Sequence, residues 1–239
     1  GLLLQLVLPG VQVARETARR QQCLHHLRRL GLAVTLHDDT YNRWPSGGWH
    51  YTWIGEPERG TGRAQPGGWA FNVLSFLDES ALRDAGRGQD GPSREESLAK
   101  RCRAVLPVFY CPSRRSAQTY PQRWNNRPFS RDGRLSRPLE WVAKTDYAAN
   151  SGTSSDVEFD HRWTGPRTLA QGDDPQFTWP DVRQFNGVVF GRSQVRRRHI
   201  RDGLSKTYLI GEKYVDTRHY VTGRDWGDNE NLFTGFNND

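Results

Sequence analysis

A continuous helical pattern at the start of the chain constrains its fold more than any other feature. The pattern opens with the apolar run LLLQLVL at residues 2–8, which is followed by Pro9. From Val11 to Val34, apolar residues recur at steps of three and four, with charged residues on the opposite face. These observations predict one helix over residues 2–36. We expect Pro9 to kink this helix rather than to end it, because the pattern resumes beyond the proline.

The apolar run at residues 2–8 needs its own explanation. It is shorter than the ~20 apolar residues of a membrane-spanning helix, yet more apolar than the end of an exposed helix. No basic segment precedes it and no small-residue cleavage site follows it, so it is not a complete signal peptide. We interpret the run as the end of a longer apolar helix, with a core helix of a soluble domain as the alternative. The chain has no methionine, and we expect it to begin inside a longer product.

The sequence of residues 37–239 predicts a globular domain that begins with loops and short helices. A chain of 239 residues is long enough to bury a hydrophobic core. The apolar spacing at Trp69–Arg83 favours a second helix. Ser93 and Glu96 match a capping box, which predicts a short helix that ends at Arg103.

Strand signals follow these helices along the chain. Short runs of β-branched and aromatic residues predict strands at Val105–Tyr110, Val188–Phe190 and Thr207–Ile210. The Asp202–Gly203 pair is a turn signal between the last two. A long helix, then short helices, then strands is an order typical of the α+β class. We therefore expect a long N-terminal helix packed on a mainly antiparallel sheet with long loops.

Three cysteines leave the redox state of the chain open. Cys102 and Cys111 are close in sequence, and an oxidising compartment would allow them to pair, with Cys23 as the odd one. Pairing needs Cα atoms within about 7 Å, whereas a straight strand between the two cysteines would span ~20 Å. Two or three buried free thiols are the alternative. The sequence has no CxxC pair, so a zinc ribbon is unsupported.

The chain is basic, with 34 Lys and Arg against 27 Asp and Glu, a formal charge of 34 − 27 = +7. The simpler explanation of this positive charge is a solvated surface. The more specific alternative is that the protein binds an anionic partner. The densest basic run is Arg196–Arg198 with His199 and Arg201. Such runs contact phosphates in nucleic-acid-binding proteins, but on a strand edge they also discourage aggregation. We place a nucleic-acid partner below the other interpretations.

Enzyme signatures are weak in this sequence. It contains no G-x-S-x-G, no H-E-x-x-H and no G-x-x-x-x-G-K phosphate loop. Ser97 and Lys100 match S-x-x-K, but no S-D-N or K-T-G element follows, and the segment is typical of a helix turn. We predict that the protein is not an enzyme and has no catalytic residues. No cofactor is expected apart from the calcium ion considered below.

Several segments, in this order and spacing, resemble a single family. They are residues 2–23, 24–44, 68–82, 106–113 (LPVFYCPS), 145–152 (TDYAANSG), 186–190 (NGVVF) and 200–213. The family is the domain-of-unknown-function family of prepilin-type proteins that are cleaved and methylated at the N-terminus. It is similar to the pseudopilins of type II secretion. The resemblance extends over nearly the whole chain.

The resemblance implies a pilin-like division into a helix at residues 1–36, truncated at its start, and a globular α+β domain at residues 37–239. Members of the family usually begin with a basic leader, a peptidase cleavage site and a Glu early in the mature helix, and this chain shows none of them. They also tend to end with a His-containing Asp-Gly motif that is absent here. We therefore expect a piece of a longer bacterial protein, cut at both ends.

The function that the resemblance implies is structural. We expect a non-enzymatic, pilin-like subunit of the cell envelope that assembles through its N-terminal helix with copies of itself or with other pilin-like subunits. The parent protein would be anchored in the membrane by the missing N-terminal segment, with the globular domain outside the cytoplasm. The alternative is an envelope-anchored module that binds a glycan or another solute, because nine tryptophans offer rings that stack on sugars.

The resemblance to major pseudopilins also implies a calcium site near the C-terminus. Asp225, Asp228 and Glu230 place three carboxylates within six residues, and Gly227 allows a tight turn. Ca²⁺ takes six to eight hard oxygen ligands, which carboxylates, amides and backbone carbonyls supply. The spacing is not that of an EF-hand. The alternative is a solvated acidic turn whose carboxylates pair with neighbouring arginines.

Overall fold

The structure is a computed structural model that describes residues 2–123, 127–153 and 165–237. It opens with one long helix, α1 (Leu2–Tyr41), which runs through Pro9 as the sequence predicts. The predicted end at Leu36 is wrong, because the helix continues to Tyr41. Asn42 then adopts a left-handed conformation with φ of 54°, and its N–H donates to the carbonyl of Asp38 (2.7 Å). Asparagine in this conformation is a common helix terminator.

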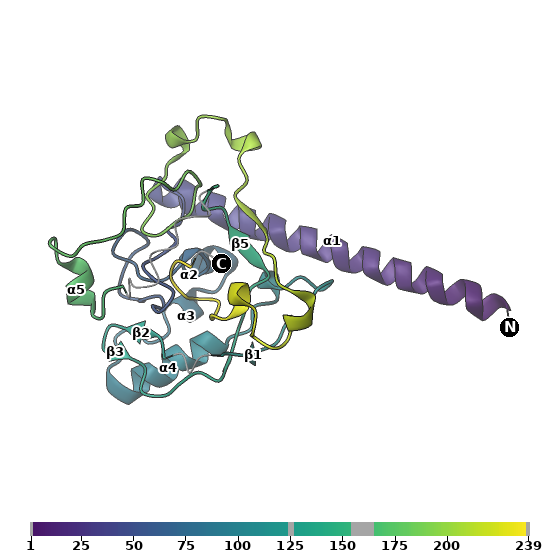
Figure 1. Ribbon diagram of the computed structural model, residues 1–239, viewed down its shortest axis with the longest axis horizontal. Helices are drawn as coiled ribbons and strands as arrows, with labels where there is room; N and C mark the ends of the chain where they lie inside the picture. Colours follow the sequence, from purple (N-terminus) through teal and green to yellow (C-terminus); the bar gives the residue numbers. More distant parts are fainter. Residues whose placement is uncertain (1, 124–126, 154–164, 238–239) are drawn as a thin grey trace.

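The two halves of α1 have different surroundings. The leading half, residues 2–22, extends away from the rest of the molecule (Figure 1). Between Pro9 and Gln22 every side chain is exposed or half-buried. The docked half, residues 23–41, buries one face against the body, with Leu30 at 0% exposure. The backbone of the opening run at residues 2–8 thus lies away from the body, which disfavours the alternative of a core helix for this run.

A disulfide joins the docked half of α1 to the body. It pairs Cys23 with Cys111, whose Cα atoms are 5.0 Å apart. The prediction that Cys102 pairs with Cys111 is wrong, because Cys102 lies in another part of the core as a buried free thiol. Burial raises the pKa of that thiol to about 11. One turn beyond the disulfide, the ring of His26 hydrogen-bonds the carbonyl of Tyr110 (2.8 Å).

The second helix expected at Trp69–Arg83 is three short ones. They are α2 (Trp69–Asn72), the 3₁₀ helix η1 (Leu74–Leu77) and α3 (Ser80–Arg83). The chain breaks at Asp78, which has a left-handed φ of 66°. The apolar spacing predicts the buried face of this segment correctly, because Phe71, Leu74 and Leu77 are all in the core. It does not report this break.

Helix α4 (Gly91–Arg103) ends where the sequence predicts but begins earlier. Pro92 lies in its first turn, a position that proline favours because no N–H bond is lost there. The predicted capping box is not formed, since the Ser93 hydroxyl donates to the carbonyl of Asp90 (3.1 Å). The remaining helices of the described residues are η2 (Pro107–Phe109), α5 (Leu169–Asp173), η3 (Arg197–His199), η4 (Leu204–Lys206), η5 (Thr217–His219) and η6 (Trp226–Asp228).

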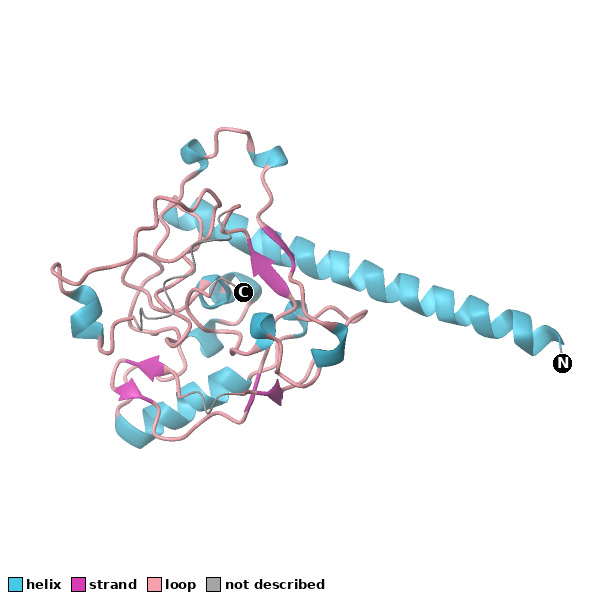
Figure 2. Cartoon of the chain, in the orientation of Figure 1, coloured by secondary structure: helices cyan, strands magenta, loops and turns pink. Residues whose placement is uncertain are grey.

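The strands are short, and loops make up most of the body (Figure 2). They form three two-stranded antiparallel sheets. The pairs are β1 (Tyr120–Pro121) with β4 (Trp141–Val142), β2 (Phe129–Ser130) with β3 (Gly133–Arg134), and β5 (Tyr147–Ala149) with β6 (Ile210–Glu212). The α+β class is confirmed, with small sheets in place of one larger sheet.

The strand predictions fail for local reasons. At Val105–Tyr110 the chain instead turns into η2, closed by a hydrogen bond from Phe109 to the Leu106 carbonyl (3.0 Å). Val188 and Val189 form no strand, because both N–H groups donate to the single carbonyl of Asn150. Of the strand predicted at 207–210, only Ile210 belongs to β6.

The main core lies between the docked half of α1 and the body. Its largest members come from segments far apart in the sequence, which explains how short elements hold together. They include Leu30, Val34, Phe71, Leu74, Phe109, Tyr110, Tyr147 and Phe233. Two smaller clusters lie around Leu98 and Cys102 and around the stacked rings of Trp53 and Phe129.

Candidate functional site

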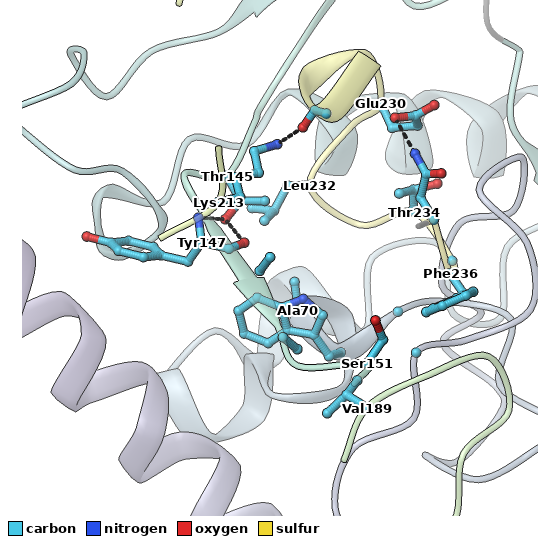
Figure 3. A pocket seen from close by; sticks show the side chains of 18 of the residues that line it. Ala70, Thr145, Tyr147, Ser151, Val189, Lys213, Glu230, Leu232, Thr234 and Phe236 are labelled. Atoms are coloured by element: carbon cyan, nitrogen blue, oxygen red, sulfur yellow. Dashed lines mark hydrogen bonds between the residues drawn. The ribbon is translucent and has the colours of Figure 1, made fainter. Parts of the chain in front are cut away.

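A pocket of about 530 Å³ opens in the body beside β5. Its walls come from several separate stretches of chain, namely Gly47, Gly68–Ala70, residues 145–152, Val189, Lys213 and Tyr214 just after β6, and residues of the C-terminal segment 225–237. Figure 3 shows side chains from these stretches around a common space. Pockets of ~300–1,000 Å³ with a few convergent polar groups are the usual size for small-molecule sites.

The lining of the pocket combines apolar and polar side chains. Its apolar residues, called the apolar wall, are Trp69, Ala70, Tyr147, Val189, Leu232 and Phe236. Its polar residues, called the polar wall, are Thr145, Asn150, Lys213, Asp225, Glu230 and Asn231. A mixed lining of this kind suits a ligand that has both apolar and polar groups.

A buried ionic cluster next to the polar wall holds its backbone in place. Both terminal nitrogens of Arg115 donate to the Asp228 carboxylate (2.6 and 2.9 Å), and one of them also forms an ion pair with Asp146 (2.7 Å). Lys213 reaches the same Asp228 carboxylate at 3.0 Å. Burial opposes ionisation of Asp228, but the charges of Lys213 and Arg115 outweigh it and hold the pKa below its ordinary value. Charge-assisted, bidentate pairs of this kind fix geometry.

Lys144 fastens the same segment from the other side. Its ammonium donates to the backbone carbonyls of Asp228 (2.9 Å) and Glu230 (2.8 Å). Burial lowers the pKa of Lys144 to about 8, although the neighbouring carboxylates act in the opposite direction. With its donors directed to backbone oxygens, Lys144 positions the pocket wall.

The structure gives the three predicted calcium ligands separate partners. The Asp225 carboxylate accepts the N–H groups of Gly227 (2.9 Å) and Asp216 (2.7 Å). Asp228 faces Arg115, and Glu230 accepts from the Asn237 amide (2.9 Å). Among the described residues, these carboxylates do not form a group close enough to share a metal ion. The calcium site therefore stays a prediction.

The seven tryptophans that the structure describes do not gather on one surface as a sugar-binding platform would require. Trp44, Trp49 and Trp53 are buried, and Trp69 and Trp179 are half-buried. The exposed ones are Trp141 and Trp226, at 52% and 69%. The remaining two, at positions 124 and 163, lie outside the described residues.

The basic run at 196–201 has a structural role for one member. Arg197 forms ion pairs with Asp38 and Asp39 near the end of α1. The side chain of Arg197 is about half exposed. Part of the positive charge of this run is thus neutralised within the molecule.

The family of the chain follows from a comparison with family models. The model described as "Protein of unknown function (DUF1559)" matches residues 12–235. The chain belongs to this family. Membership of the DUF1559 family carries no assigned activity. Neither curated proteins nor solved structures provide a match to the chain. Within the described residues, no helix combines the length and the apolar character that crossing a membrane requires.

The pocket and the ionic cluster were missed by the sequence reasoning. One signal for the pocket was available, because several segments that carry the family resemblance meet there. Residues from 68–82, 145–152, 186–190 and 200–213 all contribute to its walls. The cluster gave no such signal, since its members Arg115, Asp146 and Asp228 are distant along the chain.

Proposed function

We propose that the protein is a pilin-like structural subunit of the bacterial cell envelope that assembles through the leading half of α1. One observation carries this proposal. A single helix of 40 residues is joined to the body by its second half, while the backbone of its first half extends away from the body and the side chains from Pro9 to Gln22 are exposed or half-buried.

Physical chemistry favours a partner for the leading half. Most helical stability in proteins comes from packing of an apolar face, so an unsupported helix is marginal in water. Val11 and Val13 are 41% and 67% exposed, and the run before them is apolar in sequence except for Gln5. Covering such a surface gains about 25 cal/mol per Å² of apolar area. Neighbouring copies of the same helix would supply that cover.

The Cys23–Cys111 disulfide supports a location outside the cytoplasm. Disulfides persist in oxidising compartments and are rare where thiols are kept reduced. We propose that the parent protein is anchored in the membrane ahead of this helix. Fractionation of the source cells tests the location, with the protein expected in the membrane fraction and its body digested by protease added outside. Recovery in the soluble cytoplasmic fraction with free Cys23 would contradict it.

Assembly is tested by two matched substitutions on α1. Val13 and Leu32 are both exposed apolar residues, at 67% and 59%, but only Val13 lies in the leading half. In sedimentation velocity, the full chain is expected to associate with rising concentration. Val13→Arg is expected to abolish this association, and Leu32→Arg is expected to leave it unchanged. Equal effects of both substitutions, or a monomer at every concentration, would count against assembly through the leading half.

The pocket favours a second candidate function, an envelope module that binds a small molecule. Its size and its mixture of apolar and polar walls carry this candidate. The two functions are compatible, because the pocket is formed entirely by the body and includes no residue of α1.

A further inference from the structure

We propose that the pocket beside β5 binds an uncharged, hydroxyl-rich small molecule of the sugar class. The inference rests on the second candidate function above, and it is independent of assembly through α1. Three features of the pocket walls carry it, namely an unpaired amide donor, the balance of charge and an aromatic rim.

The first feature is a buried donor without an acceptor. Asn231 is 3% exposed and lines the pocket. Its side-chain oxygen accepts the N–H of Phe233 (2.9 Å), which fixes the orientation of the amide. The Nδ2 group is buried and has no hydrogen-bond partner. An unpaired buried donor is costly. Nδ2 is covered in the empty pocket, so a ligand oxygen that reaches it through a small movement of the wall would remove this defect.

The second feature is the charge of the lining. Lys213 is the cation among the described residues of the pocket wall. Its ammonium already forms an ion pair with the Asp228 carboxylate and donates to the Gly227 carbonyl. Asp225 and Glu230 add two carboxylates to the same wall. An anionic ligand would therefore meet net negative charge. A hydroxyl group both donates and accepts, which matches carboxylate acceptors on one side and the Asn231 donor on the other.

The third feature is aromatic surface at the pocket. Tyr214 lines it with a side chain that is 82% exposed, and half-buried Trp69 forms part of the apolar wall. Aromatic rings with one polar end are suited to ligands that present both an apolar face and polar groups. A sugar ring has C–H groups on its faces and hydroxyls at its edge. It therefore matches the mixed apolar and polar lining, part of which Figure 3 shows.

The test is a binding screen on the full chain with a matched pair of variants. Glucose, galactose, N-acetylglucosamine and cellobiose are titrated at millimolar concentration, with binding followed by ligand-observed NMR and calorimetry. At least one is expected to bind. Tyr214→Ala is expected to raise its Kd about tenfold, an aromatic contact of ordinary strength. Tyr208→Ala is the control, because Tyr208 is 85% exposed and does not line the pocket.

A second variant tests the donor directly. Asn231→Asp keeps an oxygen for the Phe233 N–H and replaces the unpaired donor with an acceptor. It is expected to weaken sugar binding at least as much as Tyr214→Ala, with folding monitored by circular dichroism. Should Asn231→Asp fail to fold, the Tyr214 and Tyr208 pair still decides the proposal.

The outcomes separate the ligand class from the binding function. If no neutral sugar binds but amino acids or short peptides do, the sugar class is overturned and the binding module stands. If sugars, amino acids, peptides and inorganic phosphate all fail to bind, both are overturned. Equal effects of Tyr214→Ala and Tyr208→Ala would also overturn the proposal, because binding would then lie elsewhere.

Discussion

The two halves of α1 share one helix but differ in what surrounds them. The docked half places Leu30 and Val34 in the core and is fastened by the disulfide at Cys23. Among the side chains described in the leading half, Glu16 accepts a hydrogen bond from the Ser113 hydroxyl of the body (2.9 Å). The comparison teaches that helical periodicity alone does not separate an element that stabilises the fold from one that is available to a partner.

The largest expected effect contrasts an ion pair of the body, at Asp228, with ion pairs of the leading half, at Glu16. Asp228→Asn removes the buried partner of Arg115 and Lys213. Breaking a buried pair in this way should cost about 4 kcal/mol in the free energy of unfolding. Glu16→Gln, on the leading half, loses its ion pairs with Arg19 and Arg20 in solvent but keeps an oxygen that accepts from Ser113, so it should have no measurable effect. Urea denaturation measures both, and a stable Asp228→Asn protein would refute the role of the cluster.

The Cys23–Cys111 disulfide is the covalent link between the docked half and the body. Its two cysteines are 88 residues apart in sequence. Replacing Cys23 and Cys111 together with serine should lower the free energy of unfolding by about 4 kcal/mol, since a long closed loop is released in the unfolded chain. Reductant should lower the melting temperature of the native chain by a comparable amount and leave that of the double variant unchanged. A native chain that is insensitive to reductant would speak against this link.

Apolar packing separates the halves in the same direction. Leu30→Ala should cost about 3 kcal/mol, because it leaves a cavity in the main core. Val13→Ala should change the free energy of unfolding by less than about 0.5 kcal/mol, because the side chain is exposed. Chemical denaturation of a dilute, monomeric sample gives both values. Comparable losses at the two positions would mean that the leading half also folds onto the body.

The smallest effect is a pH dependence confined to the docked half. Burial lowers the pKa of His37 from 6.5 to about 4, with the Arg43 carbonyl acting in the opposite direction. The unfolded chain therefore binds a proton at higher pH than the folded chain, and stability should fall as the pH drops from 6.5 to about 4. At about 1.4 kcal/mol per pKa unit, a downward shift of roughly two units corresponds to a loss of about 2–3 kcal/mol. His37→Gln should flatten this part of the curve, and an unchanged slope would assign it to other groups.

Sequence periodicity predicted α1 well because a long amphipathic pattern reports directly on a helix. The end of that helix was signalled by Asn42 and the nearby Pro45 rather than by the last apolar residue. The capping pattern at Ser93 was misleading, since Asp90 and Pro92 already begin α4. Local signals of this kind compete within a few residues, and the sequence alone does not rank them.

Features that depend on tertiary approach were beyond such reasoning. Cys102 is nearer to Cys111 in sequence, yet Cys23 is its partner because α1 docks across the body at that point. The candidate calcium ligands read as one acidic turn, but Asp228 faces inward to Arg115. The pocket combines residues from several distant parts of the chain, from Gly47 to Asn237. In each case the deciding contact joins residues whose spacing carries no periodic signal.

The central claim is that the leading half of α1 serves assembly and contributes little to the fold. A variant that begins at Gln12 tests this claim most directly, with melting temperature and sedimentation measured on the same sample. We predict an unchanged melting temperature at low concentration, together with loss of self-association. A large fall in melting temperature, or association equal to that of the full chain, would contradict the account.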